Sequence, residues 1–155
     1  MKILLALVLL LATNNFYAQS FNDDKTAFTN FLKRMYTATP FEGVKIVDDY
    51  DHQYLVSVIS LDKAKYTNPS DMNRVAQIKA QSQANTFLNG ASITMDMVIK
   101  TSEKTSKDST STLVETVEII KQNSMGFTQG LELLTNFENA DSTRMVFMYY
   151  REIKQ

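Results

Sequence analysis

The residues whose types could support chemistry are gathered in one short stretch, Asp48-Asp49-Tyr50-Asp51-His52. Three carboxylates beside an imidazole supply the oxygen and nitrogen ligands that divalent cations take in proteins. The stretch lacks the glycine and the distal glutamate of a calcium-binding loop. Acidic residues are also common in hairpin turns, where they accept hydrogen bonds from nearby N–H groups. We interpret the stretch as a turn and keep one alternative, a divalent-metal site with four candidate ligands: Asp48, Asp49, Asp51 and His52.

Few other residues could carry catalysis. His52 is the only histidine, and no Gly-x-Ser-x-Gly segment designates a nucleophilic serine for it to activate. Gly126 and Gly130 are not accompanied by the lysine and hydroxyl of a phosphate-binding loop. The chain has no cysteine, which excludes thiol catalysis, thiolate metal sites and disulfides. We therefore predict no catalytic residue and no cofactor, and expect a non-enzymatic protein.

Aromatic residues offer a candidate surface for contact with a partner. Tyr54, Tyr149 and Tyr150 lie in segments that alternate like strands. Tyrosine is amphipathic, so an exposed cluster could bind a ligand or a protein, whereas the alternative for most of these rings is a place in the core.

The start of the chain predicts export. Met1-Lys2 is followed by an apolar run from Ile3 to Ala12 and by a polar stretch that ends at Ala18-Gln19. The run is too short for a membrane-spanning helix, which needs about 20 residues. We predict a signal peptide at 1–18 and a single α+β domain at 19–155, periplasmic or secreted, with no transmembrane segment in the mature chain.

The charge balance limits the partners. When Lys2 leaves with the signal, 15 of the 16 basic residues remain against 17 acidic ones, a net charge of −2. Nucleic-acid binding requires a basic field, and attraction to anionic membranes requires a polybasic segment. We therefore expect no nucleic-acid partner, and a partner that is another envelope protein or the chain itself.

Two helices are marked by their ends and their periodicity. In the central one, 68–90, Asn68 can cap the first turn, Pro69 suits the first helical position, and Asn89-Gly90 suits a left-handed cap. Its apolar stripe is mostly alanine, which would let the helix lie flat on a sheet while its glutamines face water. The stripe comprises Met72, Ala76, Ala80, Ala84, Phe87 and Leu88. An N-terminal helix at 22–37 also has an apolar face and ends before Pro40.

Alternating apolar residues predict the strands. They form a hairpin at 43–49 and 53–62, a strand at 93–99, and a final hairpin at 131–137 and 144–153 whose last strand is apolar on both faces and therefore central. Residues 113–121 favour a strand but also fit a helix, and 123–130 reads as a glycine-punctuated turn. The fold class predicted is α+β, a two-layer sandwich with a mainly antiparallel sheet of about six strands.

Several of these features occur together in a known family. The alanine-rich helix, its Phe87-Leu88-Asn89-Gly90 exit, the next strand, the Gly130-Leu131 turn and the aromatic strand 144–150 follow one another in order. From 43 to 153 this order resembles the small bacterial envelope lipoproteins typified by the twenty-kilodalton flagellar-associated antigen. The Ala-Gln signal exit resembles those of Bacteroidetes secreted proteins. The anchoring cysteine of the lipoprotein family is missing here, so membrane attachment is not implied, and the family offers no catalytic residues to transfer.

These observations lead to one principal hypothesis and two alternatives. We expect a non-enzymatic exported protein that binds another envelope protein through a sheet edge or an aromatic patch. One alternative is a small-ligand or divalent-metal-binding protein, or a hydrolase, centred on 48–52. The other is a self-assembling structural component.

Overall fold

The computed structural model describes residues 24–49, 52–90, 98–100, 120, 122 and 124–153. The chain forms two compact units, Met1–Pro40 and Phe41–Gln155. In the first unit residues 24–38 are helical, close to the predicted range of 22–37. The predicted signal peptide lies outside the described residues. The second unit contains all of the described strands.

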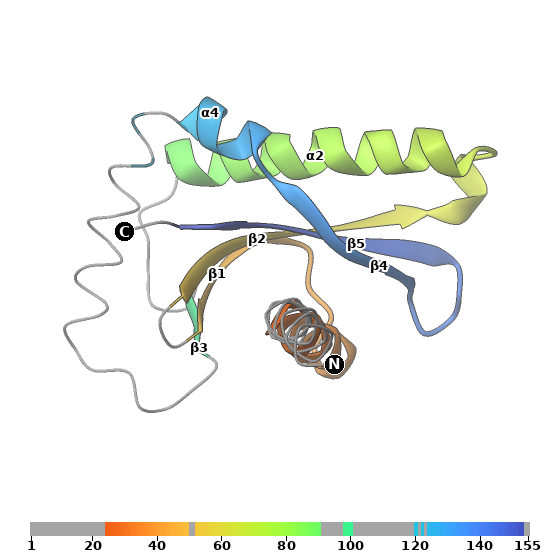
Figure 1. The fold of residues 1–155 in the computed structure, drawn as a ribbon. Helices are drawn as coiled ribbons and strands as arrows, with labels where there is room; N and C mark the ends of the chain where they lie inside the picture. The colour runs from red at the N-terminus through yellow and green to blue at the C-terminus, as the bar shows by residue number, and fades with distance from the viewer. Residues whose placement is uncertain are drawn as a thin grey trace, which may run out of the picture. The chain divides into compact units, whose positions relative to one another are not determined.

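The second unit is built on a five-stranded sheet with the order β3-β1-β2-β5-β4 (Figure 1). Its strands are β1 (Gly43–Asp49), β2 (His52–Asp62), β3 (Val98–Lys100), β4 (Glu132–Glu138) and β5 (Arg144–Glu152). Both predicted hairpins are confirmed, since β1 pairs antiparallel with β2, and β4 with β5. β5 lies between β2 and β4, as its apolar faces predicted. The α+β class is therefore confirmed.

The predicted number of strands is wrong for the described residues. They form four antiparallel strands and the three-residue β3, which runs parallel to β1. Most of the predicted strand at 93–99 lies outside the described residues, as does 113–121 apart from Ile120, which is helical. Alternation marks a segment as strand-like but does not give the direction or the length of its pairing.

The interpretation of 123–130 as a turn is also wrong. Residues Ser124–Gln129 form the short helix α4, which packs on α2 (Pro69–Gly90). The Ser124 hydroxyl exchanges hydrogen bonds with the Asn89 side chain at 3.0 and 3.2 Å. A helix this short is marginal by itself and depends on such tertiary contacts. Gly130 then ends it where the Arg151 guanidinium leaves no room for a side chain.

Helix α2 has the predicted start and the predicted buried face, but a different end. The Ser70 N–H donates to Asn68 Oδ1 at 2.9 Å, which is an N-cap. The buried residues are Met72, Ala76, Ala80, Ala84 and Leu88. Gly90 remains helical, with no positive φ, and the left-handed cap is therefore wrong. Near this end of the helix, Asn89 Nδ2 donates to the Asn85 carbonyl at 2.9 Å.

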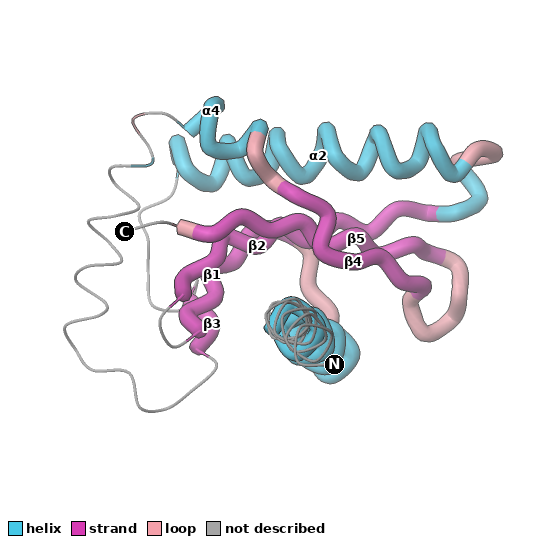
Figure 2. The backbone as a smooth tube through the Cα atoms, viewed as in Figure 1, coloured by secondary structure: helices cyan, strands magenta, loops and turns pink. Residues whose placement is uncertain are grey.

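Helices α2 and α4 cover one face of the sheet (Figure 2). The alanine stripe belongs to the same buried cluster as Ile46, Leu55, Ile59 and Phe147. The Ser57 hydroxyl donates to the Ala80 carbonyl at 3.2 Å, so the backbone of α2 comes within one hydrogen bond of a strand side chain. The predicted flat packing of this helix is confirmed.

None of the described helices combines the length and the apolar character needed to cross a membrane.

Candidate functional site

The described residues of the 48–52 stretch do not all lie on one face of the sheet. In the hairpin Asp49 is opposite His52 and Asp48 is opposite Gln53, and successive strand residues point to opposite faces of the sheet. Asp48, 5% exposed, is therefore on the α2 face, whereas the exposed His52 is on the other. Asp51 lies outside the described residues. Within the described ranges, no three His, Cys, Asp or Glu side chains gather as a metal site would require.

His52 instead pairs with a residue that the sequence did not indicate. Its Nδ1 is 2.9 Å from Oε1 of Glu152, at the far end of the chain. The His52 ring also stacks on Tyr54, with centroids 6.1 Å apart, and Tyr54 meets Tyr150 at 5.9 Å. This row becomes continuous only through the pairing of β2 with β5. Both members of the His–Glu pair are substantially exposed to solvent, and neither contacts a serine or threonine through a described hydrogen bond.

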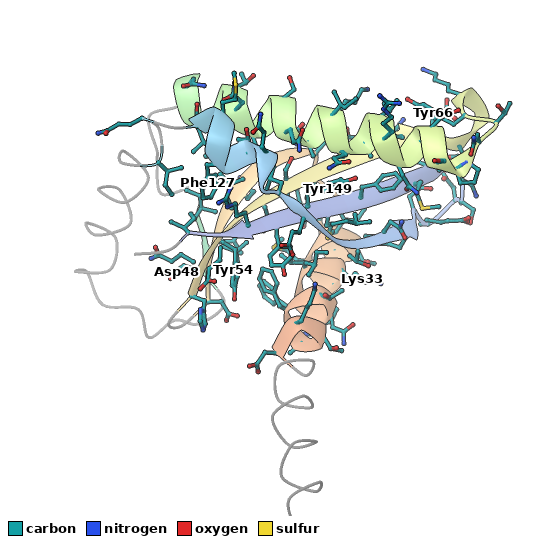
Figure 3. All side chains as sticks on the ribbon, turned by 45° about the horizontal axis from the view of Figure 1, so that its top comes forward. Lys33, Asp48, Tyr54, Tyr66, Phe127 and Tyr149 are labelled. Carbon is teal, nitrogen blue, oxygen red and sulfur yellow. The ribbon has the colours of Figure 1, made fainter. Side chains whose placement is uncertain are left out.

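The three candidate tyrosines do not share a surface. Tyr149 is only 4% exposed and lies between α2 and the sheet (Figure 3), where its hydroxyl donates to the Asn73 carbonyl at 3.4 Å. Burial raises the pKa of the Tyr149 phenol. Tyr54 and Tyr150 are half-buried on the opposite face of the sheet. Tyr149 is thus a core residue, and only the other two can be considered for contact with a partner.

Strand β4 is an edge of the described sheet, because it pairs only with β5. The Asn139 N–H donates to the Arg144 carbonyl at 3.0 Å, so the backbone groups of Asn139 face β5. In an antiparallel strand the N–H and C=O groups of successive residues point alternately to one side and to the other. Asn136 and Glu138 therefore direct their N–H and C=O groups to the outer edge. Beyond a bulge between Leu133 and Thr135, the Leu133 side chain is 41% exposed.

A groove of about 580 Å³ lies between α2 and the start of β1. Its apolar floor consists of Val44, Ile59 and Phe87. The polar lining residues are Glu42, Ser60, Lys79, Ser82, Gln83 and Thr86.

For one groove residue, Gln83, the side-chain direction predicted from the sequence is wrong. It was expected to face water, but its Nε2 donates to the Ser57 hydroxyl at 2.9 Å and to the Val58 carbonyl at 3.1 Å. One signal was present in the sequence, since Ser57 is the single polar residue in the row Leu55, Ser57, Ile59, Leu61. A hydroxyl in an apolar row requires a polar partner from the covering helix.

No protein-family model, curated protein or solved structure matches this chain.

Proposed function

We propose that the chain is a non-enzymatic exported protein of the bacterial envelope that binds an extended segment of another envelope protein along the outer edge of β4. The single observation that carries the proposal is the position of β4 at the edge of the sheet. An edge strand presents unpaired backbone donors and acceptors, on which a partner segment can add a further strand.

The side chains of β4 support this use of the edge. The exposed Leu133 offers an apolar contact beside backbone groups that point outward at Asn136 and Glu138. The exposed Glu132 stands at the start of the strand, so a partner segment with a basic residue at that end would fit best. Glu138, at the other end, is already paired with Lys63. Export and an envelope location rest on the signal-like start of the chain and on the family resemblance.

The first experiment removes one outward N–H group. Asn136→Pro deletes the donor at an exposed edge position where proline is tolerated, and Asn136→Ala is the matched control that keeps it. Tagged parent and alanine proteins should recover the same partner from envelope fractions, and the proline variant should lose it while melting within a few degrees of the parent. Equal recovery by all three proteins would refute binding at this edge.

A second measurement leaves the backbone intact. Because the chain has no cysteine, Asn136→Cys provides one attachment point for a photo-cross-linker. Illumination in envelope fractions should give one discrete heavier adduct, and a cross-linker on Ser82→Cys, on the helix side, should not give it. If only the monomer is recovered from both variants, the proposal loses its basis.

A further inference from the structure

The groove beside α2 exists because β2 is longer than its neighbour. β1 begins at Gly43, which is opposite Val58, whereas β2 continues to Asp62. Gly43 has a φ of 119°, a conformation that favours glycine and turns the incoming chain out of the line of the strand. The space beside Ile59 and Ser60 is therefore not filled by a strand, and α2 bounds it on the other side.

Side chains already donate hydrogen bonds to two backbone carbonyls of this open edge. The Val58 carbonyl accepts a hydrogen bond from Gln83, and the Ser60 carbonyl accepts one from Arg144 Nη2 at 2.7 Å. Arg144 Nε also donates to the Ser60 hydroxyl at 2.6 Å. An added strand would have to displace these contacts, whereas a small molecule would not. The groove is thus better suited to a small ligand than to a peptide.

The charges around the groove favour an anion. Glu42 accepts a hydrogen bond from Arg144 Nη2 at 3.3 Å, so its carboxylate is already balanced. Lys79 has no carboxylate partner among the residues that the structure describes. Within the described part of the chain, Lys79 is therefore a positive charge without an ion-pair partner, and it lies one helical turn from the amide of Gln83.

We propose that this groove binds an amphipathic carboxylate, such as a medium-chain fatty acid. The apolar chain lies on Val44, Ile59 and Phe87, and the carboxylate is paired with the Lys79 ammonium. Burial of the alkyl chain removes apolar surface from water, so the floor supplies affinity and the lysine supplies selectivity for the charged head. This site is separate from the β4 edge and does not depend on the function proposed there.

The test is an NMR titration of the mature protein with octanoate, 1-octanol and acetate. Octanoate should shift the amide signals of Val44, Ile59 and Phe87, 1-octanol should bind more weakly at the same residues, and acetate should leave them unchanged. Shifts that follow protein concentration without added octanoate would show that a second copy of the chain fills the groove, and would overturn the proposal.

Three variants distinguish the contribution of the apolar floor to binding from that of the Lys79 charge. Lys79→Glu should weaken octanoate binding roughly fivefold or more, as expected for reversal of an exposed ion pair, and leave 1-octanol binding unchanged. Lys65→Glu is the control with the same change in net charge, since Lys65 is exposed in η1 (Lys63–Lys65), which does not line the groove. Ser82→Trp at the exposed rim should block both ligands. Unchanged octanoate binding in Ser82→Trp, or no octanoate binding by the parent, would refute the site.

Discussion

At the scale of single residues, Ala80 shows why the stripe on α2 is made of alanine. Its side chain is completely buried, and its carbonyl accepts the hydrogen bond from Ser57. A larger residue at 80 would have to push the helix away from the sheet or adopt an unfavourable rotamer. The alanines thus set the distance at which Gln83 can also reach the strand below.

Ala80→Leu should therefore destabilise the fold by about 1–3 kcal/mol, the usual cost of overpacking a filled core. Urea unfolding, followed by circular dichroism, measures the change. Gln77→Leu is the matched control, because it adds leucine to the exposed side of the same helix and should change stability by less than about 0.5 kcal/mol. An Ala80→Leu protein as stable as its parent would mean that the stripe does not pack on the sheet.

At the scale of elements, the β4–β5 turn is held by polar contacts around two carboxylates. A hydrogen bond from the Lys63 ammonium, at 2.5 Å, is the main cause of the lowered pKa of Glu138, and Ser142 and the Lys63 charge add to it. Hydrogen bonds from the Thr143 hydroxyl and backbone N–H lower the pKa of Asp141. Ser142 completes the turn with a φ of 57°. Both side chains are exposed, so solvent and salt weaken their contribution.

This turn predicts a loss of stability in acid. The folded-state pKa of each carboxyl is below its ordinary value of 4.5 for Glu138 and 3.8 for Asp141, so the charged forms favour folding. That stability is complete above the unfolded-state pKa and is lost as the pH falls through the folded-state pKa. Thermal melts of the parent and of a Glu138→Gln, Asp141→Asn double variant should differ in Tm near neutral pH. The difference should shrink between about pH 5 and pH 3, and a difference independent of pH would contradict the assignment.

The elements that were predicted correctly are those marked by patterns of residues close together in sequence. The N-cap at Asn68, the alternation in 43–62 and 131–153, and the alanine stripe all depend on residues close together in sequence. The helix α4 was missed because Gly126 within it indicates a turn, and the contact that supports it, Ser124 with Asn89, spans 35 positions of sequence. Pairing of β3 with β1 was likewise invisible, because it is set by packing between distant segments.

The candidate sites were harder to predict than the fold. The composition of the acidic stretch suggested a metal site. Side chains alternate between the two faces of a sheet, however, so Asp48 and His52 lie on opposite faces. The groove depends on the register that places Gly43 opposite Val58 and leaves the end of β2 without a neighbour on that side. Register and overhang are not readable from residue types alone. The sequence therefore predicts no more for Lys79 than a solvated charge on the outside of a helix.

At the scale of the whole molecule, the exposed edge of β4 raises the question of self-association. An edge strand that can accept a partner segment can also pair with a second copy. Two features of β4 oppose this: it has a bulge between Leu133 and Thr135, and glutamates stand at both of its ends. Bulged and charged edges are among the usual means by which proteins avoid pairing with themselves.

We therefore expect the protein to be a monomer in light scattering at micromolar concentrations, and to reach a larger assembly only with the envelope partner proposed above. The net charge of −1 adds only weak repulsion between copies, so the shape and charge of the edge are the main barrier. A dimer that depends on concentration and disappears in Asn136→Pro, but persists in Asn136→Ala, would show that β4 pairs with itself. The edge would then act in self-assembly, and an envelope partner would not be required to explain its exposed backbone.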